Sequence, residues 1–185
     1  ANIDNRFYTY TPDSRVTLGS LGGEVRLDGT AFGTYLPPSM TAVSFGGDVS
    51  LVANPLVFFP SPVGQLELLA RGNVTGNFIG STETRLTQSD QDRSLLPGVD
   101  RPDLEPVAPV SARVPVHAND PQRNLVVARD GSVQSRPGAA GYWTMELAKA
   151  SLIQAGTDIS NVSVRVQNIN PADISSFQAG RDITM

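Results

Sequence analysis

The chain contains no cysteine, which excludes disulfide bonds and thiolate metal sites. It also contains no run near the roughly 18 apolar residues of a membrane-spanning helix, so we expect a chain that does not span a membrane. Basic residues form no cluster, and the net charge is −4 with a pI near 4.9. This charge excludes a generic binder of nucleic acid or of anionic membranes. Residues 1–10 lack the charged and then apolar pattern of a signal peptide.

Aromatic residues are also few, at 6%, whereas the chain has 17 glycines and 14 prolines. This balance favours many short strands and turns over packed helices. A length of 185 residues is enough for one domain with a buried core.

A repeat near the C-terminus organises the chain. The phrase QAGTDI at 154–159 returns as QAGRDI at 178–183, 24 residues later. A Gly-polar turn followed by an apolar residue occurs at four earlier positions as well. The six turn glycines are Gly23, Gly47, Gly72, Gly131, Gly156 and Gly180. Their spacings are 24, 25, 59, 25 and 24 residues, which indicates a solenoid with rungs of about 24–25 residues.

Apolar residues alternate on both sides of these turns, as Val43 and Phe45 do before Gly47 and Val49 and Leu51 after it. Alternation of this kind predicts strands with one inward and one outward face. A rung of 24 residues is too short for a βαβ unit and fits three short strands. We therefore predict an all-β solenoid whose rungs pair in parallel. Glycine at each turn is expected to supply a positive φ, and the polar residue after it to hold its own corner.

The 59-residue spacing corresponds to one rung plus about 35 inserted residues. Residues 76–123 are rich in proline between Pro97 and Pro121 and are otherwise polar. We predict one solenoid domain with rungs over 1–75 and 124–185, and a Pro-rich loop excursion over 76–123.

Two shorter segments leave alternatives open. Residues 142–150 fit a two-turn helix and a strand equally well. Residues 56–59 (LVFF) lie between two prolines and predict a corner strand or a bulging loop. The pair Phe58–Phe59 is either an exposed contact patch or ordinary core, and core packing is the favoured interpretation.

Three patterns together resemble a known family. IQAGTDI, followed by a strand and QNINPADISSFQAGRDI, is similar to the repeat units of filamentous haemagglutinin-like outer-membrane adhesins of proteobacteria. VFFPSPVGQLELLARGNV with the segment Ser89–Pro97, and the opening YTYTPDSRVTLGSLGGEV, resemble two further patterns of that family. The three patterns cover about two-thirds of the chain.

The resemblance implies a right-handed parallel β-helix that an outer-membrane transporter secretes in two-partner secretion. It further implies an internal fragment of a longer chain, secreted or displayed at the bacterial cell surface. Its function would be adhesion to an unknown glycan or protein receptor on a host or another cell, a virulence-related role without enzymatic activity. The alternative is a carbohydrate-active β-helix enzyme, a polysaccharide lyase or hydrolase. Several carboxylates converging in one groove would favour the enzyme.

The turn column offers the first candidate site. Its polar residues are Glu24, Asp48, Asn73, Ser132, Asp158 and Asp182. Asp158 and Asp182, one rung apart, have the spacing of a paired-carboxylate or Ca²⁺ site. The favoured interpretation is that each aspartate caps its own turn. The second candidate is His117, the only histidine, with Asn119 and Asp120 nearby.

A metal site at His117 lacks a second histidine or cysteine, and we expect His117 to lie in a mobile stretch unsuited to catalysis. We therefore predict no catalytic, cofactor-binding or metal-binding residue and no cofactor. Strand edges at both ends of an isolated solenoid would remain unpaired, so we expect the segment to aggregate or to need neighbouring rungs.

Overall fold

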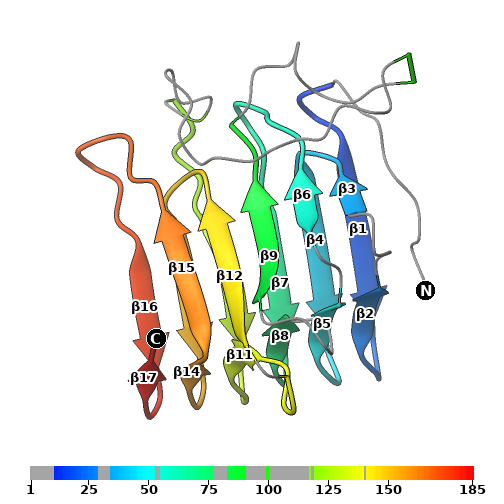
Figure 1. The fold of residues 1–185 in the computed structure, drawn as a ribbon, viewed down its shortest axis with the longest axis vertical. Helices are drawn as coiled ribbons and strands as arrows, with labels where there is room; N and C mark the ends of the chain where they lie inside the picture. Colours follow the sequence, from blue (N-terminus) through cyan, green and yellow to red (C-terminus); the bar gives the residue numbers. More distant parts are fainter. Residues whose placement is uncertain are drawn as a thin grey trace.

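The computed structural model describes residues 11–28, 34–52, 55–76, 83–90, 99–100, 117, 119–139 and 141–185. Within these residues every regular element is a β-strand, and the strands form three parallel sheets (Figure 1). Each rung gives one strand to each sheet, and the last described rung gives a strand to two of them. The predicted all-β parallel β-helix is therefore confirmed.

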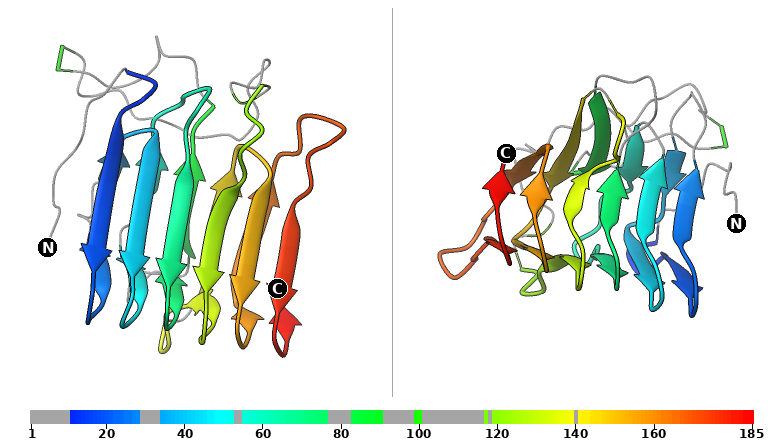
Figure 2. Two further views of the ribbon diagram at one scale, coloured as in Figure 1. Left: turned by 180° about the vertical axis from the view of Figure 1, so that it is seen from behind. Right: turned by 90° about the horizontal axis from the view of Figure 1, so that it is seen from below.

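Sheet A consists of β1 (Arg15–Ser20), β4 (Ser39–Ser44), β7 (Leu66–Ala70), β10 (Asn124–Ala128), β13 (Ser151–Ala155) and β16 (Ser176–Ala179). Sheet B consists of β2 (Val25–Asp28), β5 (Val49–Val52), β8 (Val74–Gly76), β11 (Val133–Ser135), β14 (Ile159–Ser160) and β17 (Ile183–Thr184). Sheet C consists of β3 (Thr34–Leu36), β6 (Leu56–Phe58), β9 (Glu83–Gln88), β12 (Tyr142–Leu147) and β15 (Val162–Val166). Figure 2 shows that the rungs follow one another in chain order along the rod.

The register gives the true rung length. In sheet B the residues that pair from rung to rung are Val25, Val49, Val74, Val133, Ile159 and Ile183. The steps are therefore 24, 25, 59, 26 and 24 residues. They agree with the glycine count except near Gly156, which lies one position earlier in its turn than Gly131 does.

The long step does not interrupt the ladder. Leu68 on β7 pairs directly with Val126 on β10, although 58 positions separate them along the chain. The stretch predicted as an excursion, 76–123, contains β9, which pairs with β6 and β12 in sheet C. The inserted residues therefore lie between β9 and β10, where the structure describes only residues 89–90, 99–100, 117 and 119–123.

The core is a continuous column of apolar side chains inside the rungs. Trp143, the only tryptophan, is completely buried on β12 and lies against Gly76 at the end of β8. A Cβ on Gly76 would be 2.2 Å from the indole ring, so this position requires a residue without a side chain.

Both open alternatives are settled by pairing between rungs. Residues 142–147 form β12, which pairs with β9 and β15, so the helix prediction for 142–150 is wrong. Phe58 and Phe59 are 1% and 3% exposed, so they form no contact patch and the core interpretation is confirmed. Phe59 packs with Tyr35 and Val57 in a second, smaller apolar cluster.

The turn glycines work differently from the prediction. Among the described glycines only Gly138 has a positive φ, and it lies outside the repeated turns. A Cβ on Gly47 would instead be 2.9 Å from the backbone of Gly23, and one on Gly131 would be 2.7 Å from that of Gly72. The glycines are required because adjacent turns approach one another closely.

The described residues contain no helix long and apolar enough to cross a membrane.

Candidate functional site

The polar turn column forms one aligned ladder along the rod. Asp48 Oδ1 accepts a hydrogen bond from Asn73 N at 2.7 Å, and Asn73 Oδ1 accepts one from Ser132 N at 2.9 Å. Ser132 Oγ and Asp158 Oδ1 continue the series, accepting from Asp158 N at 3.4 Å and from Asp182 N at 3.2 Å. Each of these four side chains thus caps the backbone of the next rung.

The prediction that each aspartate caps its own turn is therefore wrong. Adjacent parallel strands lie about 4.8 Å apart, so a short side chain reaches the neighbouring turn as easily as its own. In the first two rungs, serines provide the local caps. Ser20 Oγ accepts from Gly23 N at 3.1 Å, and Ser44 Oγ accepts from Gly47 N at 2.9 Å.

Asp158 and Asp182 do not act as a matched acid pair. Asp158 receives two hydrogen bonds from Arg181, Nε to Oδ1 at 2.8 Å and Nη2 to Oδ2. These contacts hold the pKa of Asp158 below its usual value, whereas the side chain of Asp182 is 75% exposed. Within the described residues no group of three or more histidine or acidic side chains is placed to hold a metal ion.

His117 lies in an unexpected environment. Its side chain is 1% exposed, and Nδ1 is 3.4 Å from Asp120 Oδ2. The same oxygen accepts a hydrogen bond from Lys149 Nζ at 2.5 Å, and Nζ also donates to Gln65 Oε1 at 2.8 Å. We refer to His117, Asp120, Lys149 and Gln65 as the corner cluster. The predicted mobile position of His117 is wrong, because this residue is packed into the corner between sheets C and A.

Burial sets the ionisation of this cluster. Desolvation, together with the positive charge of Lys149, lowers the pKa of His117 to about 4, so the imidazole is neutral at pH 7. Burial also lowers the pKa of Lys149, while Asp120 and then Glu67 oppose that shift. Asp120 therefore sits between a neutral imidazole and the Lys149 amine in a corner with little exposed surface.

A polar network continues from this cluster into the rod. Gln88 and Asn124 exchange two side-chain hydrogen bonds, at 2.8 and 3.1 Å, and Asn124 Nδ2 donates to Ser151 Oγ at 3.2 Å. Asn124 Oδ1 also accepts from Leu66 N at 3.1 Å. These residues stack on successive rungs at one corner, which is typical of asparagine and glutamine ladders. The sequence signal was a polar residue immediately before or after an apolar run at rung spacing, and it was missed.

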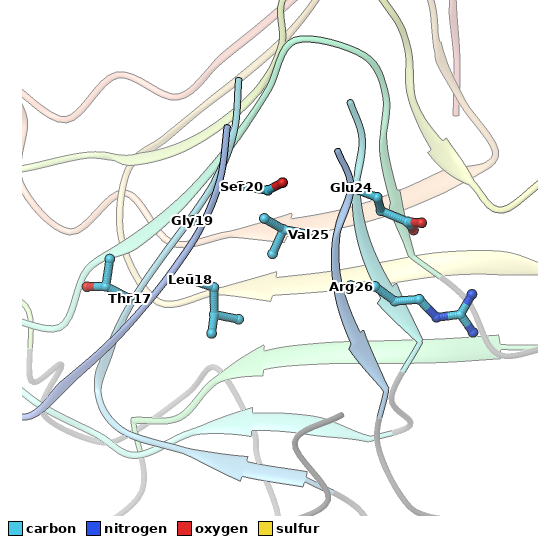
Figure 3. A pocket seen from close by; sticks show the side chains of 7 residues that line it. All are labelled: Thr17, Leu18, Gly19, Ser20, Glu24, Val25 and Arg26. Carbon is cyan, nitrogen blue, oxygen red and sulfur yellow. The ribbon is translucent and has the colours of Figure 1, made fainter. Parts of the chain in front are cut away.

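A hollow of about 300 Å³ lies at the first rung. It is lined by residues 17–20 of β1 and 24–26 of β2, and Figure 3 shows Leu18 and Val25 between the two strands while Arg26 points away. Glu24 is its one acidic side chain. The several converging carboxylates that would indicate polysaccharide cleavage are not found in this hollow.

The outer face of sheet A is a second exposed feature. Val43, Leu69 and Val127 form one half-buried outward column on β4, β7 and β10. Phe45, two residues beyond Val43, is 64% exposed. Thr41 Oγ1 donates to Glu67 Oε2 at 2.9 Å on the same face. The result is a flat, mainly apolar surface with scattered charges.

Comparison of the chain with family models, with curated proteins and with solved structures finds no match.

Proposed function

We propose that this chain is a structural and adhesive segment of a secreted filamentous haemagglutinin-like surface adhesin that mediates attachment to cells or to a host. The observation that carries the proposal is the uninterrupted parallel ladder, which runs through every rung despite the insertion between β9 and β10. Six strands about 4.8 Å apart span roughly 24 Å along the rod axis. Such a ladder makes a stiff spacer that presents its corners and outer faces at fixed intervals.

The repeated phrase that suggested the family has a physical role in each rung. In QAGTDI and QAGRDI the alanines, Ala155 and Ala179, pair in register, and Gly180 lies directly against Gly156. Asp158 caps the next rung, and Ile159 is completely buried. Each letter of the phrase therefore serves the stacking of one rung on the next, which supports a structural use of the repeat.

The ionisable groups of the described residues also support a structural role. Asp48 and Asp158 cap the backbone of neighbouring rungs, and Lys149 and Asp120 are bonded to each other below the surface. Glu146 is buried on β12, where it accepts from Arg165 Nη1 at 2.8 Å and from Thr87 Oγ1 at 3.0 Å. A polysaccharide needs exposed acids and bases along a groove, so these partnered groups favour the adhesin over the enzyme.

A binding assay tests the proposal. The labelled chain is applied to host cells and to immobilised glycans, and in parallel it is incubated with acidic and neutral polysaccharides. We expect saturable binding to at least one surface and no shortening of any polysaccharide chain. Depolymerisation, or no binding to any cell or glycan, would sink the adhesive assignment.

A deletion identifies the part of the chain that makes the contact. Replacing residues 91–116 with a short Gly-Ser linker leaves β9 and β10 unchanged in sequence, so the ladder should be retained. Lost binding with retained strand content would assign the contact to the insertion. Full binding would assign it to the faces of the rod. Secretion through an outer-membrane transporter is part of the same proposal, and deletion of the transporter should abolish surface labelling.

A further inference from the structure

The corner cluster joins two parts of the chain that are far apart in sequence. His117 and Asp120 belong to the end of the insertion that leads into β10, whereas Lys149 lies between β12 and β13. Gln65, just before β7, completes the contact by accepting from Lys149 Nζ and by donating from Nε2 to the backbone oxygen of Arg123 at 2.6 Å. The cluster therefore ties this end of the insertion to two rungs of the solenoid.

The fastened segment has few other attachments among the described residues. Asp120 N donates to His117 O at 3.0 Å, and Gln122 N donates to Asp120 Oδ1 at 3.0 Å, both within the segment itself. The bonds that reach the rod are those of Asp120 to Lys149 and of Arg123 to Gln65. His117 also lies against Gly64, where a Cβ would be 3.3 Å from the ring carbon Cε1.

We propose that the corner cluster is an acid-opened clasp, in which protonation of His117 releases the segment Asn119–Arg123 from the solenoid. His117 is the one histidine of the chain, so a change in imidazole charge can arise nowhere else. In the closed clasp the ring is buried beside the Lys149 ammonium and would need to carry a second positive charge there. In the open clasp the ring is hydrated and accepts a proton without that penalty.

The charged groups around the ring determine the direction of the switch. Lys149 disfavours the protonated ring and Asp120 favours it, and Glu67 on β7 acts on Lys149 in turn. Burial and Lys149 prevail, because the pKa of His117 lies at about 4, below its ordinary value of 6.5. A proton is therefore bound more tightly by the open form, and a fall in pH from 6.5 toward 4 favours opening. Carboxylates with ordinary or lowered pKa values remain ionised at pH 5, so His117 alone titrates in the upper part of this window.

Hydrogen exchange of the segment tests the clasp. The exchange of amides 119–123 is measured in the full chain at pH 7.5 and at pH 5, and each rate is divided by the intrinsic rate at that pH. With pKa values of 6.5 in the open form and about 4 in the closed form, the opening constant should rise on the order of 30-fold. The variant His117→Gln has no imidazole and should show no such rise. Asp158→Asn, at a different corner, should respond to acid as the parent chain does.

Two results would overturn the clasp. One is an opening constant that does not change between pH 7.5 and pH 5, and the other is an equal rise in His117→Gln. If His117→Gln is already open at pH 7.5, the imidazole of the parent chain is titrated by NMR. A value near 4 supports the clasp, and a value near 6.5 rejects it.

Discussion

The close approach of neighbouring turns gives a stability prediction with a matched control. Gly131 and Gly23 both lie immediately before the polar residue of the turn column. A Cβ on Gly131 would be 2.6 Å from Asn73 Oδ1 and 2.7 Å from the carbonyl carbon of Gly72. A Cβ on Gly23 would have one neighbour, Ser20 Oγ, at 3.6 Å, because the structure describes no rung against its outer side.

Substitution by alanine separates the steric effect from the effect on the unfolded chain. Neither glycine has a positive φ, so alanine should reduce the entropy of the unfolded chain equally at both positions, stabilising by about 0.4–1 kcal/mol. Gly131→Ala also pushes the Cβ into the backbone of the adjacent turn, and overpacking of this kind costs about 1–3 kcal/mol. The two variants should therefore differ by about 1–3 kcal/mol in the free energy of unfolding, with Gly131→Ala the less stable.

Denaturant unfolding of both variants gives this difference. Because solenoids can unfold rung by rung, the exchange rate of Thr157 N–H, which donates to Gly131 O at 2.9 Å, is followed in parallel. It should increase in Gly131→Ala and stay unchanged in Gly23→Ala. Equal stabilities for the two variants would show that the turns do not touch and would refute the steric role of the glycines.

Three further predictions concern other contacts of the rod. Asn73→Ala removes the acceptor of Ser132 N and should cost about 1–3 kcal/mol in denaturant unfolding, whereas Asn73→Asp keeps an acceptor and should cost less than that. Trp143→Ala empties the centre of the core and should cost about 3–5 kcal/mol, and a value below 1 kcal/mol would contradict the packing against Gly76. Arg181→Gln should raise the pKa of Asp158 toward its ordinary value, as measured by carboxyl chemical shifts. Because the folded pKa of Asp158 is lowered, its stabilising contribution is present above the unfolded value of 3.8 and is lost as the pH falls through the folded one.

The rung length and the parallel stacking could be predicted from the sequence because they depend on a local pattern repeated at a fixed step. Val25, Val49 and Val74 follow a Gly-polar pair in three turns, and the same residues pair in the structure. The insertion was predictable for the same reason, since its length is the excess over one step. Its limits were less clear, because β9 lies within a polar stretch and is defined by its neighbours β6 and β12.

Contacts between distant segments were not predictable from the sequence. Residues 142–150 carry signals for both helix and strand, and only the pairing of β12 with β9 and β15 favours the strand. Nothing near His117 in sequence indicates Lys149, which lies 32 positions away. The interpretation of His117 as a residue of a mobile loop followed from its proline-rich neighbours, whereas its burial comes from rungs on either side of the insertion. Likewise, the turn glycines show no local sign that the reason for their presence is another turn.

The pairing of β7 with β10 has a practical consequence. The two strands match residue for residue although the chain between them is more than twice the length of an ordinary rung. Hydrogen bonding along the rod thus depends on which rungs are adjacent and is indifferent to how much chain joins them. The junction between β9 and β10 is consequently a natural position at which to graft a foreign peptide. The scaffold beneath would carry such a graft without a change in its own register.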